Sequence, residues 1–221
     1  MKTKLITAAL SATLLVSGTA LALDMDPKFY VGGEVQGHQY KSAKQIKDKN
    51  GNVILDSKDF NNKSFLKKSG SSGSLFFGSK LTENFGLEAG YTGFSKNKHT
   101  LEGTIGANKH SLKLETKNQN LYLDALGYLP VADNVDLIGS AGIGRLTSKV
   151  TANDTITPVA GGANTVVKTT GKSHKAGVRV GLGAQYKFNA NMGARLMVRH
   201  QKGNQLVKSV NSAGLGLFYE F

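Results

Sequence analysis

Eight stretches of strict two-residue alternation constrain the fold of this 221-residue chain more than any other feature of its sequence. Successive side chains of a strand point to opposite faces, so each stretch is predicted to be a strand with two different faces. A strand that crosses a membrane in a barrel needs about 9–11 residues, which fits their lengths. The predicted strands are 29–38, 74–81, 85–93, 120–129, 135–144, 176–188, 192–200 and 212–221.

The two faces of these strands differ in charge. One set of alternate positions contains no Asp, Glu, Lys or Arg in any of the eight strands, whereas the other set contains ten such residues. A Lys or Arg in the middle of a lipid-facing surface costs about 2–4 kcal/mol, so this segregation favours a membrane barrel with a polar lumen over a soluble sandwich. The ten charged residues are Glu34, Lys80, Glu88, Asp124, Asp136, Arg179, Lys187, Arg195, Arg199 and Glu220.

The connections between the predicted strands are alternately long and short. Short connections cover 82–84, 130–134 and 189–191, and long ones cover 39–73, 94–119, 145–175 and 201–211. Short periplasmic turns and long extracellular loops are typical of outer-membrane barrels. The sequence therefore predicts an all-β fold, an eight-stranded antiparallel transmembrane barrel with four long extracellular loops.

The first 22 residues predict a secretory signal peptide, which leaves 23–221 as the outer-membrane barrel domain. Lys2 and Lys4 precede a short apolar stretch, and Ala20-Leu21-Ala22 fits a cleavage site. The apolar stretch is too short for a helix that spans a bilayer, which needs about 20 residues. Export also argues against nucleic acid as a partner, although the formal net charge is +13.

The sequence resembles the small outer-membrane barrels of Gram-negative bacteria, the OmpA-like transmembrane and opacity-like group, also described as the outer membrane protein beta-barrel domain or porin family. The resemblance rests on 29–33 (FYVGG), 81–91 (LTENFGLEAGY), 126–134 (LGYLPVADN) and 215–221 (LGLFYEF). It implies a place in the outer membrane among lipid and lipopolysaccharide, and insertion by the outer-membrane assembly machinery. The last strand is similar to the family's assembly signal, here Leu215, Leu217, Tyr219 and Phe221.

The lumen of an eight-stranded barrel is just wide enough for side chains, so we expect it to be filled. An unpaired charge there would be costly, which predicts a polar network of ion pairs and hydrogen bonds. Its members are Glu34, Lys80, Glu88, Asp124, Arg179, Arg195 and Arg199, with Lys80, Arg195 and Arg199 expected to pair with the acids Glu34, Glu88 and Asp124. The alternative is a narrow, porin-like diffusion channel.

The long loops are strongly basic and carry a net charge of +14. Lysine clusters attract phosphate, which predicts contact with lipopolysaccharide or with acidic host surfaces, as in an adhesin. A solvated surface without a dedicated ligand is the alternative. Within these loops Asn50-Gly51 predicts a hairpin over 46–55, and 155–170 is expected to be mobile.

An enzyme is not expected, and neither is a metal or cofactor site. The chain has no cysteine, and its histidines show no metal-binding spacing. Ser173, His174 and His200 fall near the outer rim, where some outer-membrane barrels carry hydrolytic residues, but their spacing defines no triad. A lipid-modifying enzyme is therefore the weakest of the three functional readings.

Overall fold

The computed structural model describes residues 27–42, 45–47, 53–56, 69–105, 108–158, 163–203 and 207–221, so the predicted signal peptide lies outside the described residues. The described part of the chain contains no helix long and apolar enough to cross a membrane. Its elements are the strands β1 (Lys28–Ser42), β2 (Gln45–Lys47), β3 (Val53–Asp56), β4 (Ser69–Lys80), β5 (Phe85–Phe94), β6 (Asn97–Ile105), β7 (Asn108–Ala132), β8 (Val135–Pro158), β9 (Thr165–Lys187), β10 (Met192–Lys202) and β11 (Val207–Glu220).

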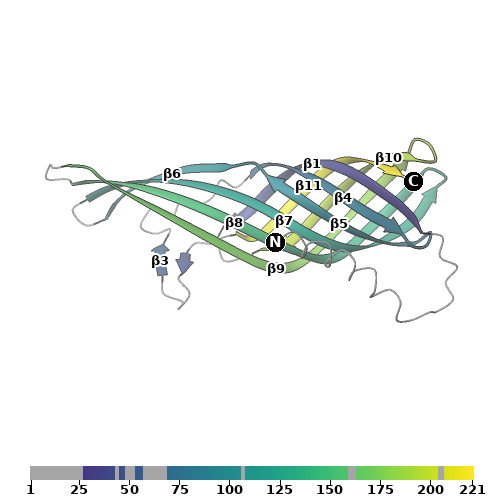
Figure 1. Cartoon of the computed structure of the whole chain (residues 1–221), viewed down its shortest axis with the longest axis horizontal. Coiled ribbons are helices and arrows are strands. Elements are labelled where there is room, and N and C mark those ends of the chain that lie inside the picture. The colour runs from purple at the N-terminus through teal and green to yellow at the C-terminus, as the bar shows by residue number, and fades with distance from the viewer. Residues whose placement is uncertain are drawn as a thin grey trace, which may run out of the picture.

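Eight of these strands form a closed antiparallel ring. The order is β1, β4, β5, β7, β8, β9, β10 and β11, and β11 pairs back with β1. Each strand predicted from alternation lies inside one strand of the ring or extends at most one residue beyond it, and several ring strands are much longer than predicted. The predicted eight-stranded antiparallel barrel is confirmed (Figure 1).

Three strands continue far beyond the barrel at its long-loop end (Figure 1). We call this projection the outer sheet: β6 together with residues 108–119 of β7, 145–158 of β8 and 165–176 of β9. The alternation pattern predicts long loops for these segments, and the structure instead extends the strands through them. Above the lipid the outward face of a strand need not be apolar, so charged side chains such as Lys113 and Lys117 take the outward positions there, although the hydrogen-bonded ladder continues.

Two smaller expectations about the loops have different outcomes. The strands of the hairpin predicted over 46–55 are confirmed, because β2 pairs antiparallel with β3 and Ile46 lies opposite Leu55, whereas the turn residues Asn50 and Gly51 lie outside the described residues. The segment 155–170 was expected to be mobile, but Ile156 pairs with Thr165 and the ladder between β8 and β9 reaches this far. Its many Thr and Val residues fit strands as well as they fit loops.

The lumen is packed with aromatic side chains that lie against glycines. Buried Tyr30, Phe76, Tyr122, Tyr128 and Phe218 belong to one cluster with Leu126, Ile138 and Met197. A Cβ atom at Gly78 would collide with the ring of Tyr30, and one at Gly90 with the ring of Tyr122. These glycines leave the space that the large rings fill, so the narrow interior is occupied.

The outward face of the barrel is apolar and ends in an aromatic girdle. Val35, Leu75 and Leu182 are at least 70% exposed, as expected for side chains that contact lipid. At the short-turn end Phe29 stacks against Phe77 and Phe221, with ring centroids 6.0 Å and 6.5 Å apart. Aromatic belts of this kind mark a membrane–water interface, so the short-turn end lies at one surface of the bilayer.

Candidate functional site

Polar and charged side chains are concentrated in two regions, the lumen of the barrel and the outer sheet. In the lumen, Arg195 on β10 donates hydrogen bonds from both terminal nitrogens to the carboxylate of Glu88 on β5. Glu88 also accepts hydrogen bonds from the hydroxyls of Tyr30 and Tyr122, each at 3.2 Å. The three charge-assisted partners satisfy a carboxylate that is only 1% exposed.

Two further ion pairs lie next to this one. Arg199 donates from Nη2 to Oε2 of Glu34 at 2.9 Å, and Nη2 of Arg195 lies 3.6 Å from the same oxygen. Arg179 donates from Nε to Oδ2 of Asp124 at 2.7 Å. The central lumen therefore holds three arginines and three acids in direct contact, all of them buried.

Lys80 lies elsewhere than expected. Its Nζ lies 3.7 Å from Oδ2 of Asp136, toward the short-turn end of the barrel. It forms no ion pair with Glu34, Glu88 or Asp124. Its ammonium group also lies 4.7 Å from the ring centroid of Tyr128. Since Lys80 is the last residue of β4, its side chain enters the lumen one layer away from Glu88 and Asp124. Arg179, which was expected in the polar network without a named partner, pairs with Asp124.

The residues of the suggested assembly signal lie on the lipid face of β11. Leu215, Leu217, Tyr219 and Phe221 are between 47% and 62% exposed. The backbone N–H of Phe221 donates to the carbonyl of Phe29 at 2.9 Å, which joins the last residue to the first strand. The suggested signal therefore lies on the strand that closes the ring by pairing with β1.

The outer sheet carries a row of three lysines on its outward face. Lys117 lies directly opposite Lys149, which lies directly opposite Lys172. All three are exposed, and none forms an ion pair with another described residue. Like charges directly opposite each other destabilise a sheet, so this row is electrostatically unfavourable without an anion. We call these three, with Lys109, Lys113, Arg145 and Lys168 on the same outward face, the basic face.

Sequence reasoning counted these cations as loop charge and missed their alignment. The signal that could have revealed it is a spacing of four residues, which keeps strand side chains on one face. Lys109, Lys113 and Lys117 have this spacing, as do Arg145 and Lys149. The register between the strands, which places one row beside the next, could not be read from the sequence.

A hollow of about 480 Å³ lies just below the row of lysines, and we call it the rim hollow. Arg145, Lys172 and His174 line it, together with Tyr91, whose hydroxyl donates to Oε1 of Gln119 at 3.3 Å. Its lining contains no carboxylate. The rim hollow therefore offers cationic and neutral donors at one place on the outside of the barrel.

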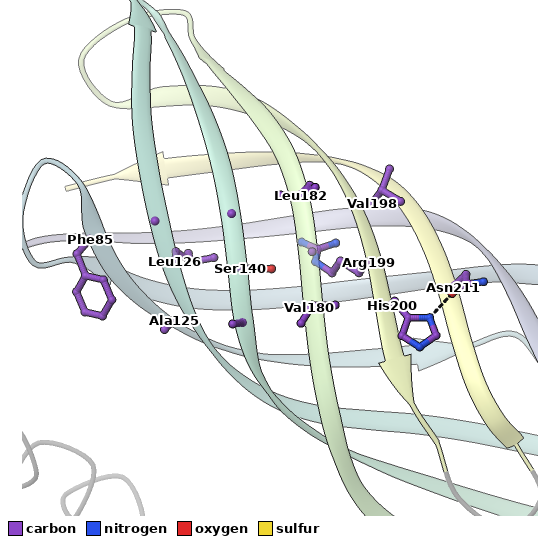
Figure 2. A pocket seen from close by; sticks show the side chains of 14 residues that line it. Phe85, Ala125, Leu126, Ser140, Val180, Leu182, Val198, Arg199, His200 and Asn211 are labelled. Atoms are coloured by element: carbon purple, nitrogen blue, oxygen red, sulfur yellow. Dashed lines mark hydrogen bonds between the residues drawn. The ribbon is translucent and has the colours of Figure 1, made fainter.

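A shallow apolar groove crosses the lipid face below the rim hollow (Figure 2). Its floor is made of Ala125 and Gly127 on β7 and of Gly139 and Ala141 on β8, and we call it the wall groove. Larger side chains from the neighbouring strands flank it, and its volume is about 750 Å³. They include Phe85, Val180, Leu182 and Val198, and Figure 2 shows His200 bonded to Asn211 at its far end.

The structure does not bring the three candidate hydrolytic residues together. His200 on β10 lies opposite Val180, whereas Ser173 is seven positions further along β9. At about 3.3 Å per residue the separation along the strand is about 23 Å. Nδ1 of His200 lies 2.5 Å from Oδ1 of Asn211 instead. Among the described residues no group of His, Asp and Glu could hold a metal ion.

Comparison with known proteins relates the sequence to one family. The family model for the outer membrane protein beta-barrel domain matches residues 8–221. A search among curated proteins finds no match.

Several solved structures are similar to this chain at low sequence identity. The outer membrane protein OprG from Pseudomonas aeruginosa is 12% identical over 89% of this chain and 97% of that chain, with a TM-score of 0.56. The attachment invasion locus protein Ail of Yersinia pestis is 12% identical over 90% of this chain and 100% of that chain, with a TM-score of 0.46. Ail has also been solved in complex with the heparin analogue sucrose octasulfate.

The β-barrel domain of OprF from Pseudomonas aeruginosa is 18% identical over 87% of this chain and 97% of that chain, with a TM-score of 0.46. The match to the family model covers nearly the whole chain, and the closed ring with its apolar exterior has the geometry that this family requires. The chain therefore belongs to the outer-membrane β-barrel family of Gram-negative bacteria.

Proposed function

We propose that this barrel is a structural surface protein whose basic face contacts anionic groups at the cell surface, either lipopolysaccharide phosphates or acidic host polysaccharide. The observation that carries the proposal is the register of Lys117, Lys149 and Lys172 across three neighbouring strands. Repulsion among them is relieved when an anion binds, so the free energy that the sheet loses in isolation is recovered in the complex.

The chemistry of the basic face suits a polyanion better than a single small ligand. Its cations are exposed and follow strands β7, β8 and β9 over the length of the outer sheet. Exposed lysines bind phosphate and sulfate as point charges without demanding one geometry. Such contacts weaken as salt screens them, over a distance of about 8 Å at physiological ionic strength.

The lumen supports a structural role more than a channel. Arg195 and Glu88 connect strands on opposite sides of the ring, and Arg199 with Glu34 lies beside them. A passing solute would have to separate buried ion pairs, which costs about 3–5 kcal/mol for each pair broken. We therefore infer that the protein acts through its surface and not by conduction.

Binding to immobilised heparin and to lipopolysaccharide tests the proposal. The Lys117→Gln/Lys149→Gln/Lys172→Gln variant should elute from heparin at lower salt than the parent protein. At about 1 kcal/mol for each lysine near an anionic surface, affinity should fall roughly a hundredfold. The matched control is Lys41→Gln/Lys202→Gln/Lys208→Gln, which removes the same charge from β1, β10 and β11 and should elute like the parent. Equal elution of both variants contradicts the proposal.

A further inference from the structure

We infer that the wall of the barrel between β5 and β9 binds one phosphorylated lipid of the outer leaflet, with its phosphate in the rim hollow and an acyl chain in the wall groove. The inference deepens the proposed function, on which it rests for the preference for anions, because it names the source and the position of one ligand. It shares Lys172 with the row of lysines and otherwise uses residues below that row.

The rim hollow has the donors that a phosphate group requires. Arg145 presents a planar guanidinium that binds two phosphate oxygens at once. Lys172 and His174 come from the neighbouring strand β9, where His174 lies opposite Thr147. A site lined by these groups and by no carboxylate attracts an anion of concentrated charge, and a phosphate monoester fits that description.

The height of the rim hollow matches the level of lipid head groups. Arg145 lies ten positions after Val135, where β8 leaves the short turn. Ten residues at about 3.3 Å each, on a strand tilted by about 40°, rise roughly 25 Å, which is the height of the apolar band of a barrel. Tyr91, which lies opposite Leu121, provides an aromatic ring at the same boundary. The phosphate would therefore lie at the outer edge of the hydrocarbon region.

An apolar path leads from the rim hollow down to the wall groove. Directly below Arg145 on the outward face, Ile143 lies opposite Leu123, and both are at least half exposed. Below them Ala141 lies opposite Ala125 and Gly139 opposite Gly127, so the surface is recessed there. From Arg145 to Gly139 the path is six residues, about 20 Å along the strand and about 15 Å in depth. This depth equals one leaflet of a bilayer core of about 30 Å.

The combination of the two sites selects their occupant. A free phosphate would use the rim hollow without the groove, and a second barrel would cover the groove but place its own cations beside Arg145 and Lys172. An amphiphile with an anionic head and an acyl chain satisfies both sites together. We therefore commit to a phosphorylated lipid of the outer leaflet.

Native mass spectrometry of protein refolded in neutral detergent with added bisphosphorylated lipid A tests the inference. We expect one retained lipid, and at least tenfold weaker retention of lipid A stripped of its phosphates. Arg145→Gln/His174→Gln should lower retention tenfold or more, and Gly139→Leu should lower it several-fold because it fills the groove. The matched control Gly37→Leu adds the same side chain on β1, outside the groove, and should retain lipid like the parent.

Both leucine variants should fold. A Cβ at Gly37 meets nothing within 4 Å, and one at Gly139 meets only Leu182 at 4.0 Å, so heat-modifiable gel mobility should be that of the parent. Equal retention of phosphorylated and stripped lipid, or equal retention by Gly139→Leu and Gly37→Leu, overturns the inference. Complete displacement of lipid by millimolar inorganic phosphate, or dimers that form without lipid, overturns it as well.

A second measurement separates this inference from the proposed function. Lys117→Gln/Lys149→Gln leaves the rim hollow intact and should elute from heparin at lower salt than the parent protein while it retains lipid A. If this variant loses lipid A as strongly as Arg145→Gln/His174→Gln does, the rim hollow is not a separate site. That result overturns the inference but not the proposed function. Retained lipid A together with unchanged heparin binding leaves the inference standing and contradicts the proposed function.

Discussion

Arg195 and Glu88 form a bidentate ion pair between β10 and β5, two strands that are four places apart in either direction around the ring of eight. The pair therefore connects opposite walls of the barrel through its centre. Both side chains are at most 3% exposed. Because Glu88 also binds Tyr30 and Tyr122, one carboxylate holds side chains from three further strands.

Replacing Arg195 by Met should destabilise the barrel by about 3–5 kcal/mol, because Glu88 keeps a buried charge without its cation. The measurement is urea unfolding in phospholipid vesicles, followed by tyrosine fluorescence and by gel mobility. The double variant Arg195→Met/Glu88→Gln removes both charges and should recover most of the loss.

The matched control for this prediction is Lys187→Met. Lys187 pairs with Glu220 at 3.3 Å, but its side chain is 26% exposed at the end of the lumen. A partly solvated pair contributes little, so the loss should stay below about 1 kcal/mol. A loss as large as that of Arg195→Met would show that burial does not set the contribution of these pairs.

The lumen glycines should be intolerant of side chains, unlike the glycines that face lipid. Gly78→Val places a branched side chain against the ring of Tyr30 and against a carbonyl of β5, and should cost at least about 1–3 kcal/mol through overpacking. Gly37→Val on the lipid face meets open space and should be neutral or stabilising. Unfolding in vesicles measures both, and equal stability of the two variants contradicts the close packing of the Tyr30 ring against Gly78.

The sequence was sufficient to predict the barrel because lipid imposes a rule on every second residue. Leu121 and Leu123 alternate with buried Asn120 and Tyr122, and the contrast between the two faces remains visible without any structure. On the N-terminal side of Gln119 the same strand β7 runs outside the lipid, where Lys117 and Lys113 replace the leucines on the outward face. The row of apolar residues on the outward face ends there, although strand β7 continues. The strand predicted from that row therefore ends at the level where the membrane ends.

The partners within the lumen could be predicted only in part. Charge balance and narrowness require ion pairs, and Arg195 and Arg199 do contact Glu88 and Glu34. The acid that each cation meets depends on the stagger of the strands around the ring. That stagger cannot be read directly from a single sequence. For this reason Lys80 was expected at the centre but lies with Asp136 near the short turns.

The filled lumen should not conduct. Purified protein in a planar bilayer is expected to give no steady single-channel steps, because Arg195, Glu88, Arg199 and Glu34 close the centre of the barrel. Replacing all four by Ala removes the ion pairs and opens space beside the aromatic cluster, so small steps should appear if that variant folds. Regular steps from the parent protein would favour the diffusion channel over a structural role.

The terminal residue should matter for assembly beyond its contribution to the aromatic girdle. Phe221 and Phe188 both face lipid at the short-turn end, with 62% and 55% exposure, but only Phe221 directly follows the strand that closes the ring and bonds to Phe29 of β1. If the last strand acts as an assembly signal, Phe221→Ala should reduce the amount of heat-modifiable barrel in the outer membrane severalfold, while Phe188→Ala should leave it nearly unchanged. Refolding of both purified variants into vesicles isolates their stability, since no assembly machinery is present there, and similar yields are expected because each loses one interfacial ring. An equal reduction of both variants in cells would mean that Phe221 is a girdle residue and not a signal.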